Sequence, residues 1–307
     1  MTAGREPADV TVAVATCGRP AALARCLAAL ENGSVLPLEL IVVDQAQSAQ
    51  AYEAVGACPR LHGRYLTQPR LGLSASRNLA LAEATRRILA VTDDDCAPDH
   101  GWVAAIAAAF ARAPEPAAVT GPILPLGPRP AGGHAVSLRS LAAARDFRGR
   151  LVPWDVGSGA NFAAPRSLLL EQGGWDERLG VGSPGQAAED AELLYRLLSG
   201  GGLVRYDPAV VVHHEWQTWT RRLQTRSSYA HGVGALCGLR LRARDPYALR
   251  MLAAFARLHA RPLAAAAWRR DRAAATEHAL ALAAVAPGVL YGLRARRQAG
   301  PTGARRS

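Results

Sequence analysis

Three consecutive carboxylates, Asp93, Asp94 and Asp95, follow a stretch of apolar residues that is typical of a buried strand. Like charges packed this closely repel one another, and burying them costs stability unless something compensates. A divalent cation with bound phosphates would compensate, because Mg²⁺ and Mn²⁺ take oxygen ligands from one or two carboxylates and from substrate phosphates. Taken alone, the triplet fits a solvated acidic turn better than a metal site.

The elements around the triplet predict a sheet that would position it. Short apolar segments typical of strands lie at 10–16, 38–44, 63–69 and 87–95, and segments with helical spacing lie at 19–30 and 72–85. This alternation predicts a parallel sheet with helices on its faces, in which ligands bind beyond the carboxyl ends of the strands. Three of those ends carry polar groups, at 16–19, 44 and 93–95, so we expect one shared crevice there.

The second half of the chain is less regular. A helix is expected at 99–114, and a long loop rich in proline and glycine is expected at 119–135. A further strand is expected at 210–214, and Arg-rich segments with helical patterns run from there toward the end.

The formal net charge of +11 is concentrated in that last part, since 17 of the 36 basic side chains but only 4 of the 25 acidic ones follow residue 214. Apolar surface edged by arginine is typical of attachment to an anionic membrane face, and a helical appendage packed on the main domain would give the same pattern. The apolar run 279–293 is expected to be too short for a membrane span and to break at Pro287 and Gly288. Nucleic-acid binding is disfavoured because no stacking aromatics or known motif accompany the charge.

Length and composition exclude several classes of protein. A chain of 307 residues, half of them hydrophobic, can bury a sizeable core, which argues against wholesale disorder. The N-terminal segment has Glu6 and Asp9 before a short apolar run, which makes a poor secretory signal. The five cysteines form no CxxC pair, so neither a zinc site nor a disulfide framework is indicated, and a cytoplasmic location fits best.

Eight short motifs follow one another at characteristic intervals. In order they are "ATCGRP", "IVVDQ", "GLSASRN", "TDDDCAPD", "GSGANFAAPR", "GGWDERLG", "AEDAELLYRL" and "DPAVVVHH". This series resembles the family 2 glycosyltransferases, inverting enzymes of glycoconjugate biosynthesis that use nucleotide-sugar donors. The resemblance implies an α/β fold of the GT-A (Rossmann-like) type, with a mixed, mainly parallel sheet flanked by helices. The expected division is an N-terminal tail at 1–9, the GT-A domain at 10–220, a helical C-terminal region at 221–297 and a disordered tail at 298–307.

The resemblance also assigns residues to the nucleotide-sugar donor. Thr16 and Arg19 match the segment that contacts the nucleotide base, although Ala15 and Cys17 stand where the family usually has a proline and an aromatic residue. Asp44 matches the acid that accepts a hydrogen bond from the base, and a helix cap is its alternative role. The pair Arg77 and Asn78 matches residues that face the ribose and diphosphate, with an ordinary helix surface as the alternative for Asn78.

The aspartate triplet would be the family's DXD motif. Asp93 and Asp94 are then expected nearest the ribose and the sugar, and Asp95 is expected to bind a divalent cation, Mg²⁺ or Mn²⁺. The family also supplies a histidine ligand, for which the motif spacing favours His214 over His213. Strand alternation would turn these two imidazoles to opposite faces.

Inverting transfer also requires a base, because the attacking hydroxyl must lose its proton as it displaces the nucleoside diphosphate. In similar enzymes the second acid of the "ED" pair is the base, which implies Asp190, with Glu189 orienting it or contacting the acceptor. Spacing alone does not choose between these two acids. Asn161 is expected near the donor sugar, and Trp175 on the acceptor side or packed beneath an acceptor loop.

Two other functions use similar features. A sugar-phosphate nucleotidyltransferase shares the parallel sheet and the aspartate-bound metal, but "ATCGRPAAL" lacks the repeated glycines of its phosphate loop. A non-catalytic binding protein could keep the fold, but all the expected acids are present. The sugar, the base and the hydroxyl acceptor, which could be a glycan, a lipid-linked compound or a small molecule, are not defined by the sequence.

Overall fold

The computed structural model describes residues 7–136 and 139–296, so the tail expected at 298–307 lies outside it. Its centre is a mixed, mainly parallel sheet with the strand order β3-β2-β1-β4-β9-β6-β10-β8. These strands are β1 (Ala8–Thr16), β2 (Pro37–Asp44), β3 (Gly63–Thr67), β4 (Ile88–Asp93), β6 (Ala118–Thr120), β8 (Arg145–Phe147), β9 (Asn161–Pro165) and β10 (Val204–Tyr206). A smaller sheet joins β5 (Cys96–Pro98), β11 (Val212–His214) and β7 (Ile123–Pro125).

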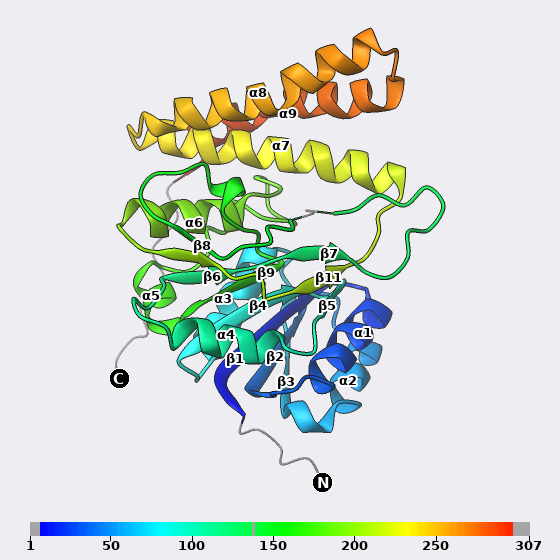
Figure 1. The fold of residues 1–307 in the computed structure, drawn as a ribbon, viewed down its shortest axis with the longest axis vertical. Helices are drawn as coiled ribbons and strands as arrows, with labels where there is room; N and C mark the ends of the chain where they lie inside the picture. The colour runs from blue at the N-terminus through cyan, green and yellow to red at the C-terminus, as the bar shows by residue number, and fades with distance from the viewer. Residues whose placement is uncertain (1–6, 137–138, 297–307) are drawn as a thin grey trace.

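Helices cover both faces of the large sheet and form a further layer at one end of the molecule (Figure 1). They are α1 (Pro20–Glu31), α2 (Ala49–Gly56), α3 (Leu73–Glu83), α4 (Trp102–Phe110), α5 (Arg166–Glu171), α6 (Glu189–Ser199), α7 (Trp219–Arg242), α8 (Tyr247–Trp268) and α9 (Arg272–Arg294). Short 3₁₀ turns lie at Pro59–Leu61 and Pro153–Asp155.

The core explains why the first strands read as continuous apolar runs. β1 sends Val12 and Val14 into a cluster with Leu23 of α1, and it sends Ala13 into a second cluster with Leu81 of α3. Both faces of the strand are therefore buried, as expected for a parallel sheet covered by helices on each side. β1 starts at Ala8, slightly earlier than the sequence pattern indicates.

The register brings the polar strand ends together. Thr16 at the end of β1 pairs with Asp44 at the end of β2, and Ala15 pairs with Asp93 at the end of β4. The three carboxyl ends therefore share one edge of the sheet, which is where such folds bind ligands.

The segment 119–135 differs from the open loop that its prolines and glycines predict. It contributes the end of β6 and the whole of β7, which pair with β10 and β11 from much later in the chain. These partners supply the backbone hydrogen bonds that a local pattern cannot reveal.

The three C-terminal helices are held together by close backbone contact between α7 and α9. Gly238 of α7 meets Gly292 of α9, and Gly234 faces the α9 backbone at Val285 and Val289. A Cβ atom added at Gly288 would lie only 2.0 Å from the carbonyl oxygen of His231. Small residues at this spacing on both helices let their axes approach closely.

α9 is one continuous helix, so the break expected at Pro287 and Gly288 is wrong. Pro287 has no N–H to donate to the carbonyl of Ala283, and both residues lie on the exposed side of α9, where water can bond that carbonyl. The next residue, Gly288, packs against α7. By length and composition α9 could cross a membrane, with a mean hydropathy of 1.4 over its most apolar 18-residue window. The apolar run at 279–293 is thus part of a longer helix of 23 residues.

Candidate active site

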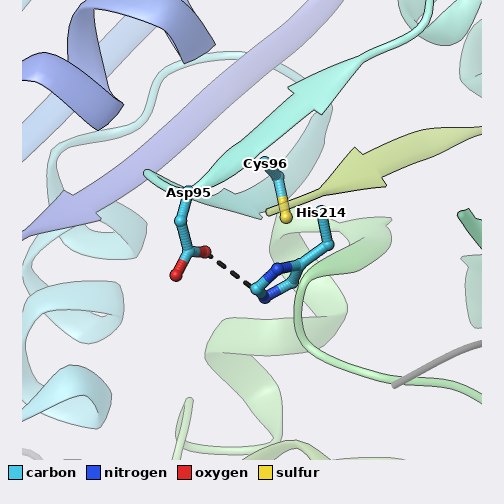
Figure 2. A group of neighbouring side chains, drawn as sticks. All are labelled: Asp95, Cys96 and His214. Carbon is cyan, nitrogen blue, oxygen red and sulfur yellow. Dashed lines mark ion pairs between the residues drawn. The ribbon is translucent and has the colours of Figure 1, made fainter. Parts of the chain in front are cut away.

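The acidic triplet meets a histidine from the small sheet. β11 pairs with β5 so that His214 lies opposite Cys96, directly after Asp95. Nε2 of His214 is 3.4 Å from Oδ1 of Asp95, and the potential ligand atoms of Asp95, Cys96 and His214 all lie within 4.8 Å of one another (Figure 2). His213 points to the other face, where its Nε2 is 3.8 Å from Oδ2 of Asp99.

The hydrogen bonds of His214 favour a metal-binding tautomer. Its Nδ1 lies 2.9 Å from the carbonyl oxygen of Glu215, and a carbonyl can only accept, so Nδ1 carries the hydrogen and neutral His214 has its lone pair on Nε2. That lone pair faces the carboxylate of Asp95, an arrangement that a cation between them would stabilise. Burial raises the pKa of the Cys96 thiol well above its usual range, so this group is neutral and a poor ligand for a hard cation. The residues present therefore fit Mn²⁺ or Mg²⁺.

Arg19 relieves part of the repulsion within the triplet. Its guanidinium pairs with Asp94 and lies 2.5 Å from Oδ2 of Asp95, while the hydroxyl of Thr16 donates to Asp94 over 2.7 Å. Asp94 is fully buried, and this burial raises its pKa to about 6 although Arg19 and Thr16 act in the opposite direction. Thr16 and Arg19 thus lie at the expected edge, where they contact the acids of the triplet.

Arg77 joins the end of β4 to the start of α6. This buried guanidinium donates to Asp93 over 2.9 Å, to Glu189 over 2.8 Å and to the carbonyl of Gly159 over 3.3 Å. Burial, followed by the charge of Asp190, raises the pKa of Glu189 to about 7, and Arg77 acts against this shift. Arg77 therefore sets the positions of two acids, and Asp93 remains partly exposed.

Glu189 and Asp190 face different surroundings. α6 begins after Ala188, whose φ of 71° is left-handed, and successive helical residues point about 100° apart. Oδ2 of Asp190 accepts a hydrogen bond from the backbone N–H of Gly159 over 2.7 Å, and Asp190 lines a cavity of about 570 Å³. Glu189 is not among the residues that line this cavity and is instead paired with Arg77.

Two expected ligand contacts are replaced by structural roles. Trp175 is 1% exposed and packs edge-on against Phe162 at a ring distance of 6.1 Å, which fits the packing alternative better than direct contact with an acceptor. Asn161 is also 1% exposed, and its side-chain amide donates to the carbonyls of Pro122 and Val210 while accepting from the indole of Trp102. It has no N–H left for a donor sugar.

Asn78 and Asp44 likewise hold local structure. The Asn78 side chain bonds both the N–H and the carbonyl of Trp175, which ties α3 to the "GGWDERLG" turn. Asp44 is fully buried and accepts hydrogen bonds from the N–H groups of Ala46 and Ser48 and from the Tyr65 hydroxyl, each within 2.8 Å. These contacts hold the turn before α2, whose N-cap is Ser48, so Asp44 has a local structural role but is not the helix cap.

The cavity beside Asp190 brings in residues that the motifs did not indicate. Arg139 comes from the segment after β7, Trp154 from a 3₁₀ turn, and Arg222 and Arg226 from the first turns of α7. The spacing of four between Arg222 and Arg226 places them on one helix face and was a usable signal. No spacing or motif in the sequence indicated Arg139 or Trp154.

The chain resembles known proteins over most of its length. Residues 11–152 match the family model "Glycosyl transferase family 2". Over 242 residues it is 27% identical to the "Pre-mycofactocin glycosyltransferase" of Mycobacterium tuberculosis, covering 76% of this chain and 48% of that protein. Over 78 residues it is 33% identical to the "Probable glycosyltransferase YdaM" of Bacillus subtilis, covering 24% of this chain and 16% of that protein. The chain spans about half the length of the first of these curated relatives and less of the second.

Solved structures share the fold. The mannosyltransferase PcManGT of Pyrobaculum calidifontis, in complex with GDP-Man and Mn²⁺, aligns with a TM-score of 0.60 at 18% identity, covering 95% of this chain and 88% of that one. A UDP complex of TarS from S. aureus, residues 1–349, aligns with a TM-score of 0.55 at 15% identity, covering 73% of this chain and 65% of that one. With the sheet and strand ends described above, these matches place residues 11–152 in glycosyl transferase family 2, within a domain of the GT-A fold.

Proposed function

We propose that the protein is a metal-dependent, inverting glycosyltransferase that moves a sugar, of the hexosyl type, from a nucleotide-diphosphate sugar to a hydroxyl acceptor. The observation that carries the proposal is the meeting of Asp95 and His214, with the lone pair of His214 directed at the carboxylate. The complexes of related folds with GDP-Man and Mn²⁺ and with UDP support a nucleotide-sugar donor.

Asp95 and His214 are the residues that would hold the cation. Bound there, Mg²⁺ or Mn²⁺ would neutralise the charge that builds on the departing diphosphate. Arg19 is partly exposed beside Asp94 and Asp95, and in the loaded enzyme we assign it and Thr16 to the nucleotide. Arg77 holds Asp93 toward the same edge.

Asp190 is the base in this proposal. An acceptor hydroxyl in the cavity gives its proton to the Asp190 carboxylate as its oxygen forms a bond to the anomeric carbon. The bond from that carbon to the diphosphate oxygen breaks, and its electron pair leaves with the nucleoside diphosphate. The N–H groups of Gly159 and Ala191 each donate to one oxygen of Asp190, and together they hold the carboxylate at the cavity wall.

Binding and product analysis test the activity. UDP, GDP and dTDP are screened for thermal stabilisation of the protein with and without Mn²⁺, since a ligand that binds only the folded state stabilises it by mass action. We expect one diphosphate to stabilise strongly and only with the metal. The matching sugar donors are then supplied with metal and membrane lipid, and the release of nucleoside diphosphate is expected.

The alternative functions give different results in the same assay. Release of pyrophosphate from a nucleoside triphosphate and a sugar phosphate would indicate a nucleotidyltransferase. Binding of a diphosphate without hydrolysis or transfer of any donor would indicate a non-catalytic protein. Either outcome contradicts the proposal.

We further propose that the region at 221–297, attached to the transferase domain at 10–220, contacts the anionic, cytoplasmic face of a membrane. α9 exposes Leu280, Leu290 and Leu293 along one side, with Ala283 and Ala286 between them. Exposed arginines stand at both ends of this helix, at 269–272 and 294–296. An apolar stripe with arginine at its ends matches a helix lying in the plane of an anionic bilayer surface.

Vesicle sedimentation tests this contact. The protein should bind vesicles that contain phosphatidylglycerol more tightly than neutral phosphatidylcholine vesicles, and Leu290→Asp with Leu293→Asp should abolish binding. Leu38→Asp is the control, because Leu38 is similarly exposed but lies on β2. Equal binding by all three proteins would contradict the membrane proposal and leave the transferase proposal intact.

A further inference from the structure

The cavity beside Asp190 is walled by two parts of the chain. Ser158 and Asp190 come from the α/β domain, whereas Tyr229 and Val233 of α7 and Phe255 of α8 come from the C-terminal helices. Its volume of about 570 Å³ lies in the range of small-molecule sites. The C-terminal helices therefore help to shape the space into which the proposed base opens.

One end of this space is apolar and aromatic. Trp154 and Phe255 pack edge to face with ring centroids 5.8 Å apart, and Leu258 continues the same wall on α8. Aromatic rings prefer such edge-to-face or offset contacts with a further ring, and an apolar wall excludes water from a bound ring. A flat or short apolar group fits this wall better than an extended sugar chain.

Arginines give the cavity its charge. Arg222 and Arg226 share one carboxylate, Glu277, with nitrogen–oxygen distances of 2.7 Å each. Arg139 donates only to backbone carbonyls among the described residues, to Asp155 over 2.9 Å and to Trp154 over 2.5 Å. Its Nε is buried and has no hydrogen-bond partner in the structure. Asp155 and Asp190 line the same cavity, and neither carboxylate pairs with Arg139.

No carboxylate pairs with the guanidinium of Arg139 among the described residues, and each of its two terminal nitrogens has a second N–H besides the one that it gives to a carbonyl. A ligand anion in the cavity would pair with this charge. We propose that this cavity is the acceptor site and that it selects a small hydroxylated molecule with an apolar ring and one carboxylate or phosphate group. The ring lies against Trp154 and Phe255, the acid is held by Arg139, and the hydroxyl faces Asp190. This inference rests on the proposed transferase function but concerns acceptor binding, which is measurable without a donor.

A matched pair of ligands tests it on the full chain. 6-Hydroxy-2-naphthoate carries a ring, a hydroxyl and an acid, and 6-hydroxymethyl-2-naphthol replaces the acid with a neutral alcohol. Binding is followed by isothermal titration and by ligand-observed NMR. We expect the naphthoate to bind at least about 10-fold more tightly, the scale of one charge-assisted hydrogen bond. Cellotriose tests the sugar-chain alternative and is expected to bind more weakly than either.

Variants test whether Arg139 causes the tighter binding of the naphthoate. Arg139→Gln should remove the advantage of the naphthoate, and Arg139→Lys should keep part of it because the charge remains. Arg129→Gln is the matched control, since Arg129 lies in the same segment and its guanidinium also donates to a backbone carbonyl, but it does not line the cavity. Val233→Phe should block both naphthyl ligands by filling the space. It keeps the test decisive if Arg139→Gln fails to fold.

The possible results distinguish a failure of the acceptor assignment from a failure of the proposed transferase function. Equal affinity for the two naphthyl ligands, a preference that survives in Arg139→Gln, or tighter binding of cellotriose would overturn the acceptor assignment. The nucleoside-diphosphate titration with Mn²⁺ on the same samples reports the donor site separately. If that titration succeeds while the naphthoate fails, only the acceptor inference is lost.

Discussion

His214 and Asp95 come from distant parts of the sequence, yet Nε2 of one lies 3.4 Å from Oδ1 of the other. The antiparallel pairing of β5 with β11 produces this contact, and the Glu215 carbonyl selects the tautomer of His214. Adjacent His213 faces Asp99 instead, so the chain contains its own control for the metal site.

Replacing the two histidines should therefore give different results. His214→Ala should weaken the Mn²⁺-dependent binding of nucleoside diphosphate by about 10-fold to 100-fold, because the metal loses a ligand. His213→Ala should bind as the parent does. Titrating each variant with diphosphate, with and without Mn²⁺, measures this, and equal losses would place the metal elsewhere.

The junction between α7 and α9 should be sensitive to side-chain size. In Gly288→Val, the new Cβ would collide with the backbone at His231, so the free energy of unfolding should fall by about 1–3 kcal/mol or more. Ala286→Val on the exposed side of α9 should change it by no more than about 0.5 kcal/mol. Urea unfolding of both variants measures this difference in the free energy of unfolding. Similar values for the two variants would mean that the helices are not closely packed.

Stability should also depend on pH through His259. Burial lowers the pKa of this imidazole to about 4, with Arg226 and His278 acting in the same direction and Glu277 against them. Because the folded pKa lies below the unfolded value, the unfolded state binds the proton first as pH falls, and stability is lost between about pH 6.5 and 4.

Comparison with His259→Asn isolates this effect. Over the same pH range the parent should lose about 1–3 kcal/mol more stability than the variant, which has no titrating group at this position. The measurement is urea unfolding at several pH values. Parallel pH profiles for the two proteins would show that His259 does not control this loss.

The sheet and the edge that holds the site could be predicted from the sequence because their signals are local. Continuous apolar strands and polar residues at their ends indicate the parallel sheet and its crevice. Strand alternation separates His213 from His214, and the structure turns them to opposite faces. These predictions needed only the spacing of residues along one element.

Other features depended on segments that meet only in the fold. Trp175 and Asn161 carry side chains suited to ligands, but Phe162, Trp102 and two distant carbonyls bury them. The cavity at Arg139 is lined by several segments that lie far apart in the sequence, so no local pattern predicts it. A proline inside a helix usually breaks it, but at Pro287 the helix continues, and the adjacent Gly288 packs on α7.

The central claim is that Asp95 binds the metal and that Asp190 accepts the proton of the acceptor hydroxyl. One paired measurement tests it. Asp95→Asn and Asp190→Asn are each titrated with nucleoside diphosphate and Mn²⁺ and then assayed for transfer, with Asp99→Asn and Glu189→Gln as controls. Asp95→Asn should lose metal-dependent diphosphate binding, because a charged oxygen ligand is removed beside a polyanion. Asp190→Asn should bind the diphosphate normally while its turnover falls by about 10²-fold or more. Full turnover in Asp190→Asn, or unchanged metal-dependent binding in Asp95→Asn, would contradict the account.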